Sequence, residues 1–159
     1  MNIDIIAVGK LREKFYQDAA AEYSKRLSRY AKLNILEVEE VRKPEKISEA
    51  LSLQIREQEA ERIRRQYRSG SRRIALVIEG RQMDSPAFAE EIRRTALSGC
   101  DSIQFLIGGA IGLGDSVIKE ADLCLSFSPM TFPHQLMRVI LLEQIYRAFR
   151  IIRGEPYHK

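Results

Sequence analysis

A glycine-rich segment follows the apolar run of residues 103–107 and is the first part of the sequence whose composition suits ligand binding. It reads Gly-Gly-Ala-Ile-Gly-Leu-Gly from Gly108 to Gly114. Glycines at the carboxyl end of a strand allow close approach of a ligand and leave backbone amides free to bind it. The spacing fits neither the dinucleotide nor the phosphate-loop fingerprint, and Asp115 disfavours a bare phosphate. The segment therefore favours a cationic or neutral ligand, with an unliganded glycine turn as the alternative.

Residues 125–135 combine aromatic, thioether and hydroxyl side chains, which is an unusual composition for a loop. Phe127, Met130 and Phe132 could clasp an adenine ring, while backbone groups of residues 128–131 read its edge. The alternative is a loop that packs against the core and is capped by its threonine. His134 follows directly and could polarise a substrate, although a histidine bonded within its own loop is the commoner arrangement.

The carboxyl-terminal tail reads Arg-Gly-Glu-Pro-Tyr-His-Lys over residues 153–159. Arg153, Tyr157 and His158 combine a phosphate ligand, a stacking ring and a titratable group, the mixture found in single-stranded RNA sites. A frayed terminus is the alternative. On the preceding helix, Glu143 and Arg147 are four residues apart, a spacing that suits an ion pair.

The hydrophobic pattern predicts the elements that position these segments. Apolar runs predict strands over residues 3–8, 33–38, 74–78, 103–107 and 123–127. Helical spacing predicts helices over 15–27, from an N-cap at Ser48 to about Tyr67, from an N-cap at Ser85 followed by Pro86, and over 133–152. Strands alternating with helices indicate one α/β domain over residues 1–159, with a mostly parallel sheet and helices on both faces.

Composition narrows the class of protein. A hydrophobic fraction of 45% beside 30% charged residues fits a globular domain and argues against disorder. The opening residues do not read as a signal peptide, and no run is apolar enough for a membrane span, so we expect a cytoplasmic protein without a membrane partner. Cys100 and Cys124 form no metal or redox motif, and we expect two buried thiols and no metal. The net charge of +4 is compatible with a polyanionic partner.

Taken together, these motifs closely resemble one family, the large-subunit ribosomal RNA pseudouridine N3-methyltransferases of the SPOUT superfamily. The resemblance extends from the opening Ala-Val-Gly-Lys-Leu of residues 7–11 to the tail. Its most specific parts are Met-Thr-Phe-Pro-His-Gln at 130–135 and Tyr-His-Lys at 157–159. It implies a SPOUT fold with a C-terminal trefoil knot, a homodimer, and S-adenosyl-L-methionine as cofactor. Periodicity could not predict the knot, because threaded chains are rare.

The resemblance also implies which residues form the site. The cofactor would lie against Leu76, Gly108, Phe127, Ser128, Pro129, Met130, Thr131 and Phe132. The substrate side would be lined by His134, Arg153, Tyr157 and His158, with the catalytic base unassigned. The implied activity is methylation of N3 of a pseudouridine in the 23S RNA of assembled 70S ribosomes, without a metal. The alternatives are methylation of transfer RNA, as by other SPOUT enzymes, and a non-catalytic nucleotide- or RNA-binding module.

Overall fold

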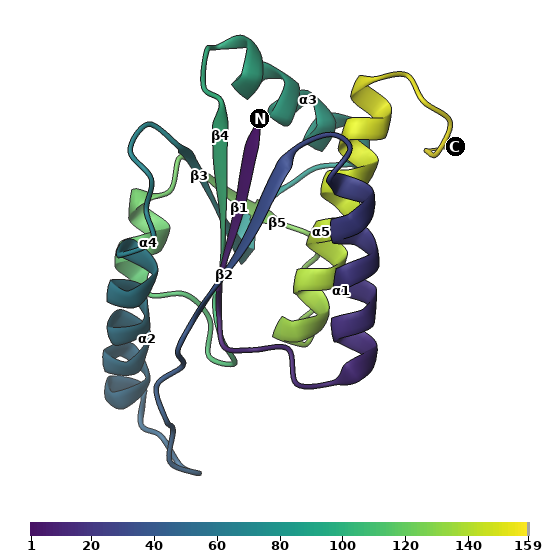
Figure 1. Ribbon diagram of the computed structural model, residues 1–159. Coiled ribbons are helices and arrows are strands. Elements are labelled where there is room, and N and C mark those ends of the chain that lie inside the picture. Colours follow the sequence, from purple (N-terminus) through teal and green to yellow (C-terminus); the bar gives the residue numbers. More distant parts are fainter. Residues whose placement is uncertain (159) are drawn as a thin grey trace.

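A computed structural model describes residues 1–158 and contains a five-stranded parallel sheet with helices on both faces (Figure 1). The strands are β1 (Asn2–Val8), β2 (Lys32–Val38), β3 (Arg72–Gln82), β4 (Ser102–Ile107) and β5 (Leu123–Ser126). They lie in the order β2-β1-β4-β3-β5, and every neighbouring pair is parallel. The predicted α/β class is confirmed, and each predicted strand is present.

The helices divide between the two faces of the sheet. One face carries α1 (Lys14–Leu27), α3 (Ser85–Leu97) and α5 (His134–Ile152), and the other carries α2 (Glu49–Arg64) and α4 (Asp115–Glu120) (Figure 1). Four of these helices were predicted. Helix α4 was not, because six residues are too few to show a helical hydrophobic period.

Side chains cap α2 and α3, but one of the two predicted caps is wrong. Ser48 accepts a hydrogen bond from the backbone N–H of Leu51 at 3.1 Å, as predicted. At α3 the cap is Asp84, which accepts from the N–H of Ala87 at 2.8 Å. Aspartate caps as well as serine does, so the predicted cap Ser85 instead occupies the first helical position.

Two apolar layers hold the sheet between its helices. Along β1, Ile5 points to the layer beneath α1, α3 and α5, whereas Ile6 points to the layer beneath α2 and α4. Covering both faces explains why this strand is a nearly continuous apolar run. Helix α1 buries Ala20 and Leu27, but Phe15 near its start is 63% exposed. Phe15 lies in the first turn of α1 and contacts the ring of Tyr16 instead of the core.

The polar residue that interrupts β1 is buried and fully partnered. The carboxylate of Asp4 accepts hydrogen bonds from Asn34 at 2.8 Å and Gln104 at 3.1 Å, and it lies 3.2 Å from the guanidinium of Arg68. A buried charge needs such partners to offset the loss of its hydration. The network ties the segment before β3 to the three strands β1, β2 and β4.

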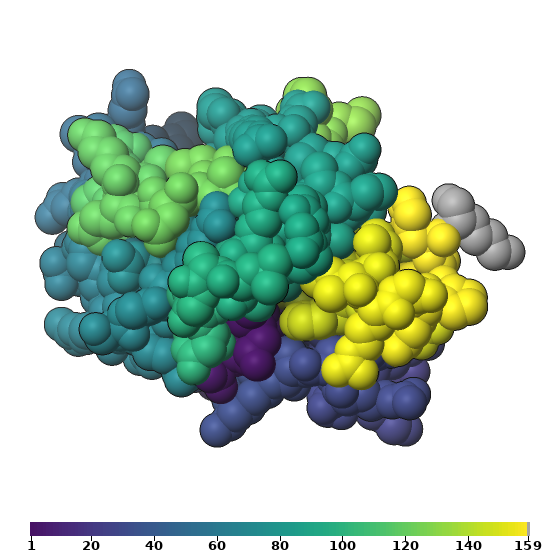
Figure 2. Space-filling view, turned by 90° about the horizontal axis from the view of Figure 1, so that it is seen from above, coloured from purple at the N-terminus to yellow at the C-terminus, as the bar shows by residue number. Residues whose placement is uncertain are grey.

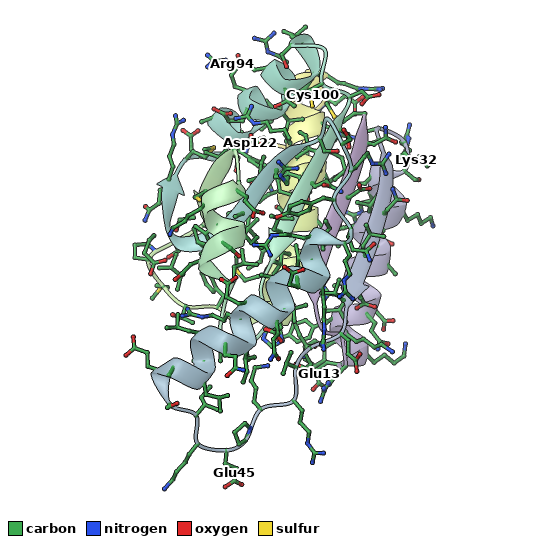
Figure 3. All side chains as sticks on the ribbon, turned by 90° about the vertical axis from the view of Figure 1, so that its left-hand side faces the viewer. Glu13, Lys32, Glu45, Arg94, Cys100 and Asp122 are labelled. Carbon is green, nitrogen blue, oxygen red and sulfur yellow. The ribbon has the colours of Figure 1, made fainter. Side chains whose placement is uncertain are left out.

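Because all strands are parallel, their carboxyl ends meet at one edge of the sheet. Figure 3 shows Glu13 and Glu45, from the segments after β1 and β2, at one end of the molecule. Lys32, Cys100 and Asp122, which lie at or just before the starts of β2, β4 and β5, are at the other end. Folds of this kind bind ligands beyond the carboxyl ends of their strands.

Both cysteines are unpaired thiols, but they are partly buried and not fully buried as expected. Each lies near a chain turn, where Cys100 Sγ contacts the carbonyl oxygen of Gly70 and Cys124 Sγ that of Ile118. Within residues 1–158, no helix is both long and apolar enough to cross a membrane.

Candidate active site

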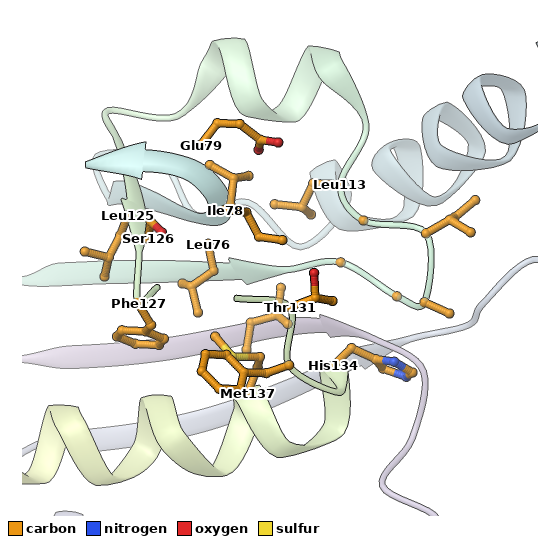
Figure 4. A pocket seen from close by; sticks show the side chains of 18 of the residues that line it. Leu76, Ile78, Glu79, Leu113, Leu125, Ser126, Phe127, Thr131, His134 and Met137 are labelled. Atoms are coloured by element: carbon orange, nitrogen blue, oxygen red, sulfur yellow. The ribbon is translucent and has the colours of Figure 1, made fainter. Parts of the chain in front are cut away.

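A cavity of about 740 Å³ opens at the carboxyl edge of the sheet (Figure 4). Part of β3 and the segments that run from the ends of its two neighbours, β4 and β5, into the following loops form most of its wall. They are residues 76–79, residues 107–113 and residues 125–134, the last without Pro129. Small-molecule sites typically enclose about 300–1,000 Å³, so this cavity can hold a ligand the size of a nucleoside.

The glycine-rich segment folds back on itself after β4. The N–H of Gly112 donates to the carbonyl of Gly109 at 3.0 Å, and Gly112 itself has a φ of +88°. A Cβ on Gly108 would lie 2.4 Å from the carbonyl carbon of Gly112 and 2.6 Å from the nitrogen of Leu113. The backbone of the loop itself therefore leaves no room for a side chain at Gly108. The sequence suggests another reason for a glycine here, namely the close approach of a ligand.

Serine side chains shape the loop between β5 and α5. Ser128 Oγ accepts from the N–H of Met130 at 3.0 Å, and Ser126 Oγ donates to the carbonyl of Ser128 at 3.1 Å. Figure 4 shows Leu76 and Phe127 toward one end of the cavity and His134 toward the other. At its mouth Met130 is 71% exposed and Ile78 43%. Large apolar side chains left in solvent beside a cavity are typical of a binding surface.

Seven of the eight residues predicted to hold the cofactor line this cavity: Leu76, Gly108, Phe127, Ser128, Met130, Thr131 and Phe132. Pro129 is exposed and does not line it. The cavity also includes Glu79 from the extended end of β3 and Arg56 from α2. Sequence reasoning missed both, because neither lies in a motif and Arg56 is one of many charged residues on its helix.

His134 lies at the start of α5 and lines the same cavity. Burial lowers its pKa below the ordinary 6.5, nearby Arg138, Lys43 and Arg12 lower it further, and Glu40 opposes the shift. Within residues 1–158 the structure shows no hydrogen bond from the imidazole to its own loop. A neutral imidazole facing a cavity at neutral pH can accept a proton.

We expect the imidazole of His134 to titrate below the pH at which a histidine in an unfolded chain titrates. Since its pKa is lower in the folded state, the unfolded state takes up the proton first as the pH falls. The stability that neutral His134 contributes is then progressively lost below about pH 6.5. NMR titration of wild type and His134→Gln identifies the resonance and measures its midpoint. A midpoint at or above 6.5 would contradict the burial of this side chain.

The tail folds back against α5. Tyr157 Oη donates to Glu143 Oε1 at 3.0 Å, and the Arg147 guanidinium lies 4.6 Å from the centre of the Tyr157 ring. The predicted ion pair between Glu143 and Arg147 is present at 2.6 Å, and Arg147 Nη1 lies 3.3 Å from His158 Nδ1. Tyr157 is thus held in place and not frayed. Lys159, the last residue of the tail motif, lies outside the described residues.

The substrate-side residues predicted from the resemblance do not all meet at the cavity. Helix α5 separates His134 from Arg153 by 19 residues, or roughly 28 Å. The Arg153 guanidinium lies 4.9 Å from the centre of the Tyr30 ring, on the side of α1 and β2. Seen from above, the end of α5 and the tail form a surface patch between α3 and the α1–β2 region (Figure 2).

His158 lies beside a second cavity that adjoins the first. It lines this cavity, of about 510 Å³, between the start of α3 and the middle of α5. The two cavities share Leu125, Phe127 and Phe132 as lining residues. The rings of Phe127 and Phe132 therefore separate the first cavity from the space beside His158.

Comparison with known families gives a match over nearly the whole chain. A family model described as "Predicted SPOUT methyltransferase" matches residues 1–158. Two relatives named "Ribosomal RNA large subunit methyltransferase H" come from Bifidobacterium adolescentis and Bifidobacterium animalis subsp. lactis. They are 55% and 54% identical to this chain, and each match covers 100% of both chains.

Solved structures show the same fold at low sequence identity. A probable methylase family protein from Haemophilus influenzae is 15% identical with a TM-score of 0.56, covering 99% of this chain and 70% of its own. A putative methyltransferase from Legionella pneumophila, solved in complex with its bound cofactor SAM, is 13% identical with a TM-score of 0.50. It covers 93% of this chain and 66% of its own.

Proposed function

The chain belongs to the SPOUT methyltransferase family, and from that premise we propose the reaction in full. It is an S-adenosyl-L-methionine-dependent methyltransferase of large-subunit ribosomal RNA. Within that activity we propose N3 of a pseudouridine as the acceptor and the assembled 70S ribosome as the substrate. The observation that carries the proposal is the cavity at the carboxyl edge of the sheet, formed by the segments that the family motif predicts.

The residues around the cavity fit S-adenosyl-L-methionine. Apolar side chains of Leu76, Phe127 and Phe132 suit an adenine ring, and the backbone of residues 128–131 suits its polar edge. The cavity volume of about 740 Å³ matches a ligand with a nucleoside and an amino-acid part. The bound cofactor supplies an electrophilic methyl group on its sulfonium.

For the substrate, the chain must hold the pseudouridine in line with that methyl and favour loss of the N3 proton. His134 faces the cavity in its neutral form, and we propose it on the substrate side. The arginines near the tail, Arg147 and Arg153, would stabilise an anionic base electrostatically. Tyr157 and His158 would stack on or contact the flipped base.

We propose that the active unit is a homodimer. Arg153 and Tyr157 face α1 and α5 of their own chain and not the cavity. A second copy that runs its α5 against this one would bring a tail to the cavity mouth. Helices α1 and α3 cover part of the apolar surface of α5, but Leu136, Val139 and Ile140 remain half-buried.

Light scattering at micromolar concentration is expected to give a mass near twice 18.3 kDa. The physical reason is that symmetric pairing of α5 covers the half-buried apolar residues on its outer side. Replacing Val139 with Glu should shift the protein toward monomer and leave far-UV circular dichroism unchanged. A wild-type protein that is monomeric at this concentration would contradict the dimer.

We propose that the ribosome supplies much of the docking surface for this enzyme. The test is incubation with labelled cofactor and, in parallel, 70S ribosomes, separated subunits or bulk transfer RNA. Label in 23S RNA of 70S ribosomes, located by mass spectrometry at N3 of a pseudouridine, supports the proposal. Label in transfer RNA alone, or binding without methyl transfer, would favour the alternative functions.

We also propose the cytoplasmic location and the trefoil knot that the resemblance implies.

A further inference from the structure

Arg56 has no side-chain partner among residues 1–158, although it lies on the wall of the cofactor cavity. It belongs to α2 and lines the cavity, and its Nε is buried without a hydrogen-bond partner. None of the hydrogen bonds or ion pairs within this range involves its guanidinium. A guanidinium carries five donors, and leaving them unused while partly buried is costly.

The carboxylates nearest to Arg56 along the same helix contact other residues, although Glu59 Oε1 is itself buried without a partner. Glu57 accepts from Ser116 through both oxygens, at 2.6 Å from Oγ and 3.2 Å from the backbone N–H. Glu59 Oε2 accepts from the N–H of Val41 at 3.0 Å and lies 3.6 Å from Lys43 Nζ. Neither carboxylate forms an ion pair with Arg56, so its charge remains available to a ligand.

The position of Arg56 is fixed by close packing of α2 against the glycine-rich segment. A Cβ on Gly114 would lie 2.8 Å from the carbonyl oxygen of Arg56 and 3.0 Å from Ala60 Cβ. The backbone of α2 therefore contacts the end of this segment directly. This packing fixes the backbone of Arg56 beside the segment, and the side-chain Nε is buried.

Three ionisable side chains line the cavity: Arg56, Glu79 and His134. Burial favours the neutral form of His134. Arg56 is thus the one permanent cation on the cavity wall within the described residues. A planar guanidinium matches a carboxylate through two parallel hydrogen bonds.

On the basis of the proposed function, we propose that Arg56 binds the carboxylate of the methionyl part of S-adenosyl-L-methionine. The carboxylate is the only anionic group of that cofactor, and Arg56 is the only fixed cation that the described part of the chain offers it in the cavity. Its binding would satisfy the unused donors and orient the sulfonium toward the substrate side. Arg56 is then a cofactor-binding residue contributed by a helix outside the three motif segments.

The test compares two ligands that differ in this carboxylate alone, S-adenosyl-L-methionine and decarboxylated S-adenosylmethionine. By calorimetry, Arg56→Met is expected to weaken binding of the first by roughly 10- to 100-fold and of the second by less than about twofold. Arg56→Lys keeps the charge but loses the planar guanidinium, so its loss of affinity for the intact cofactor should be intermediate. Arg65→Met is the matched control, since Arg65 is exposed at the end of the same helix and does not line the cavity.

Two results would overturn the proposal for Arg56 while leaving the cofactor site intact. One is equal weakening of both ligands, which would indicate distortion of the cavity. The other is unchanged cofactor affinity with weaker binding to ribosomes, which would place Arg56 against an RNA phosphate. Failure of the proposed function itself would look different, because wild-type protein would then bind neither ligand.

Discussion

Deletion of residues 157–159 is expected to reduce methyl transfer to 70S ribosomes on the order of 100-fold or more. Loss of base stacking alone is worth about 1–3 kcal/mol, and misplacement of the reacting atoms adds to that loss. Cofactor affinity should change little, since neither Tyr157 nor His158 lines the first cavity. The measurement is single-turnover transfer of labelled methyl, beside calorimetry with the cofactor.

The contacts of Tyr157 require controls for stability. Its hydroxyl bonds Glu143, and its ring packs edge-on against Tyr146 at 4.9 Å between ring centres. Tyr157→Phe keeps the ring and removes the hydrogen bond to Glu143. His158→Ala leaves both this hydrogen bond and the packing of the Tyr157 ring in place. If the tail contacts the target base, His158→Ala should lower transfer without lowering the melting temperature. Wild-type turnover by the truncated protein would show that the tail has no catalytic role.

Replacing Gly108 with Val is expected to abolish cofactor binding. A Cβ at this position would lie 2.4 Å from the carbonyl carbon of Gly112, so the loop of residues 108–113 must move. That loop forms one wall of the cavity, and its displacement removes the site itself. The loop contains no strand or helix residue of its own, so the far-UV circular dichroism should stay close to that of wild type.

Gly70→Asn is the matched control for this change. Gly70 also has a positive φ, of +76°, but nothing lies within 4 Å of a Cβ built there. Asparagine tolerates this conformation, and the turn is remote from the cavity wall. We expect wild-type cofactor affinity for the control. Cofactor binding by Gly108→Val within a few fold of wild type would mean that the loop is not part of the site.

The sequence alone predicts the five strands, four of the five described helices and the class of fold. Apolar runs marked all five strands because both faces of the sheet are covered, and periodicity marked the long helices because each buries one side. The composition of residues 125–135 pointed to an adenine-like ligand, because aromatic and thioether side chains suit the faces of a flat ring. Leu76, in contrast, came from the family resemblance, since nothing in its local pattern distinguishes it from other strand residues.

Which segments lie together depends on the tertiary packing and is not encoded in any local pattern. Hydrophobic periodicity reports whether a residue is buried, but it does not report which strands pair, so the order β4-β3-β5 could not be predicted from it. That order places the ends of three strands around one cavity and brings Arg56 to its wall from a helix some fifty residues earlier than the glycine-rich segment. The fold also holds Tyr157 against α5, and it separates Arg153 from His134 by the length of that helix. Such contacts join residues far apart in the chain, and their energies depend on packing that no local pattern encodes.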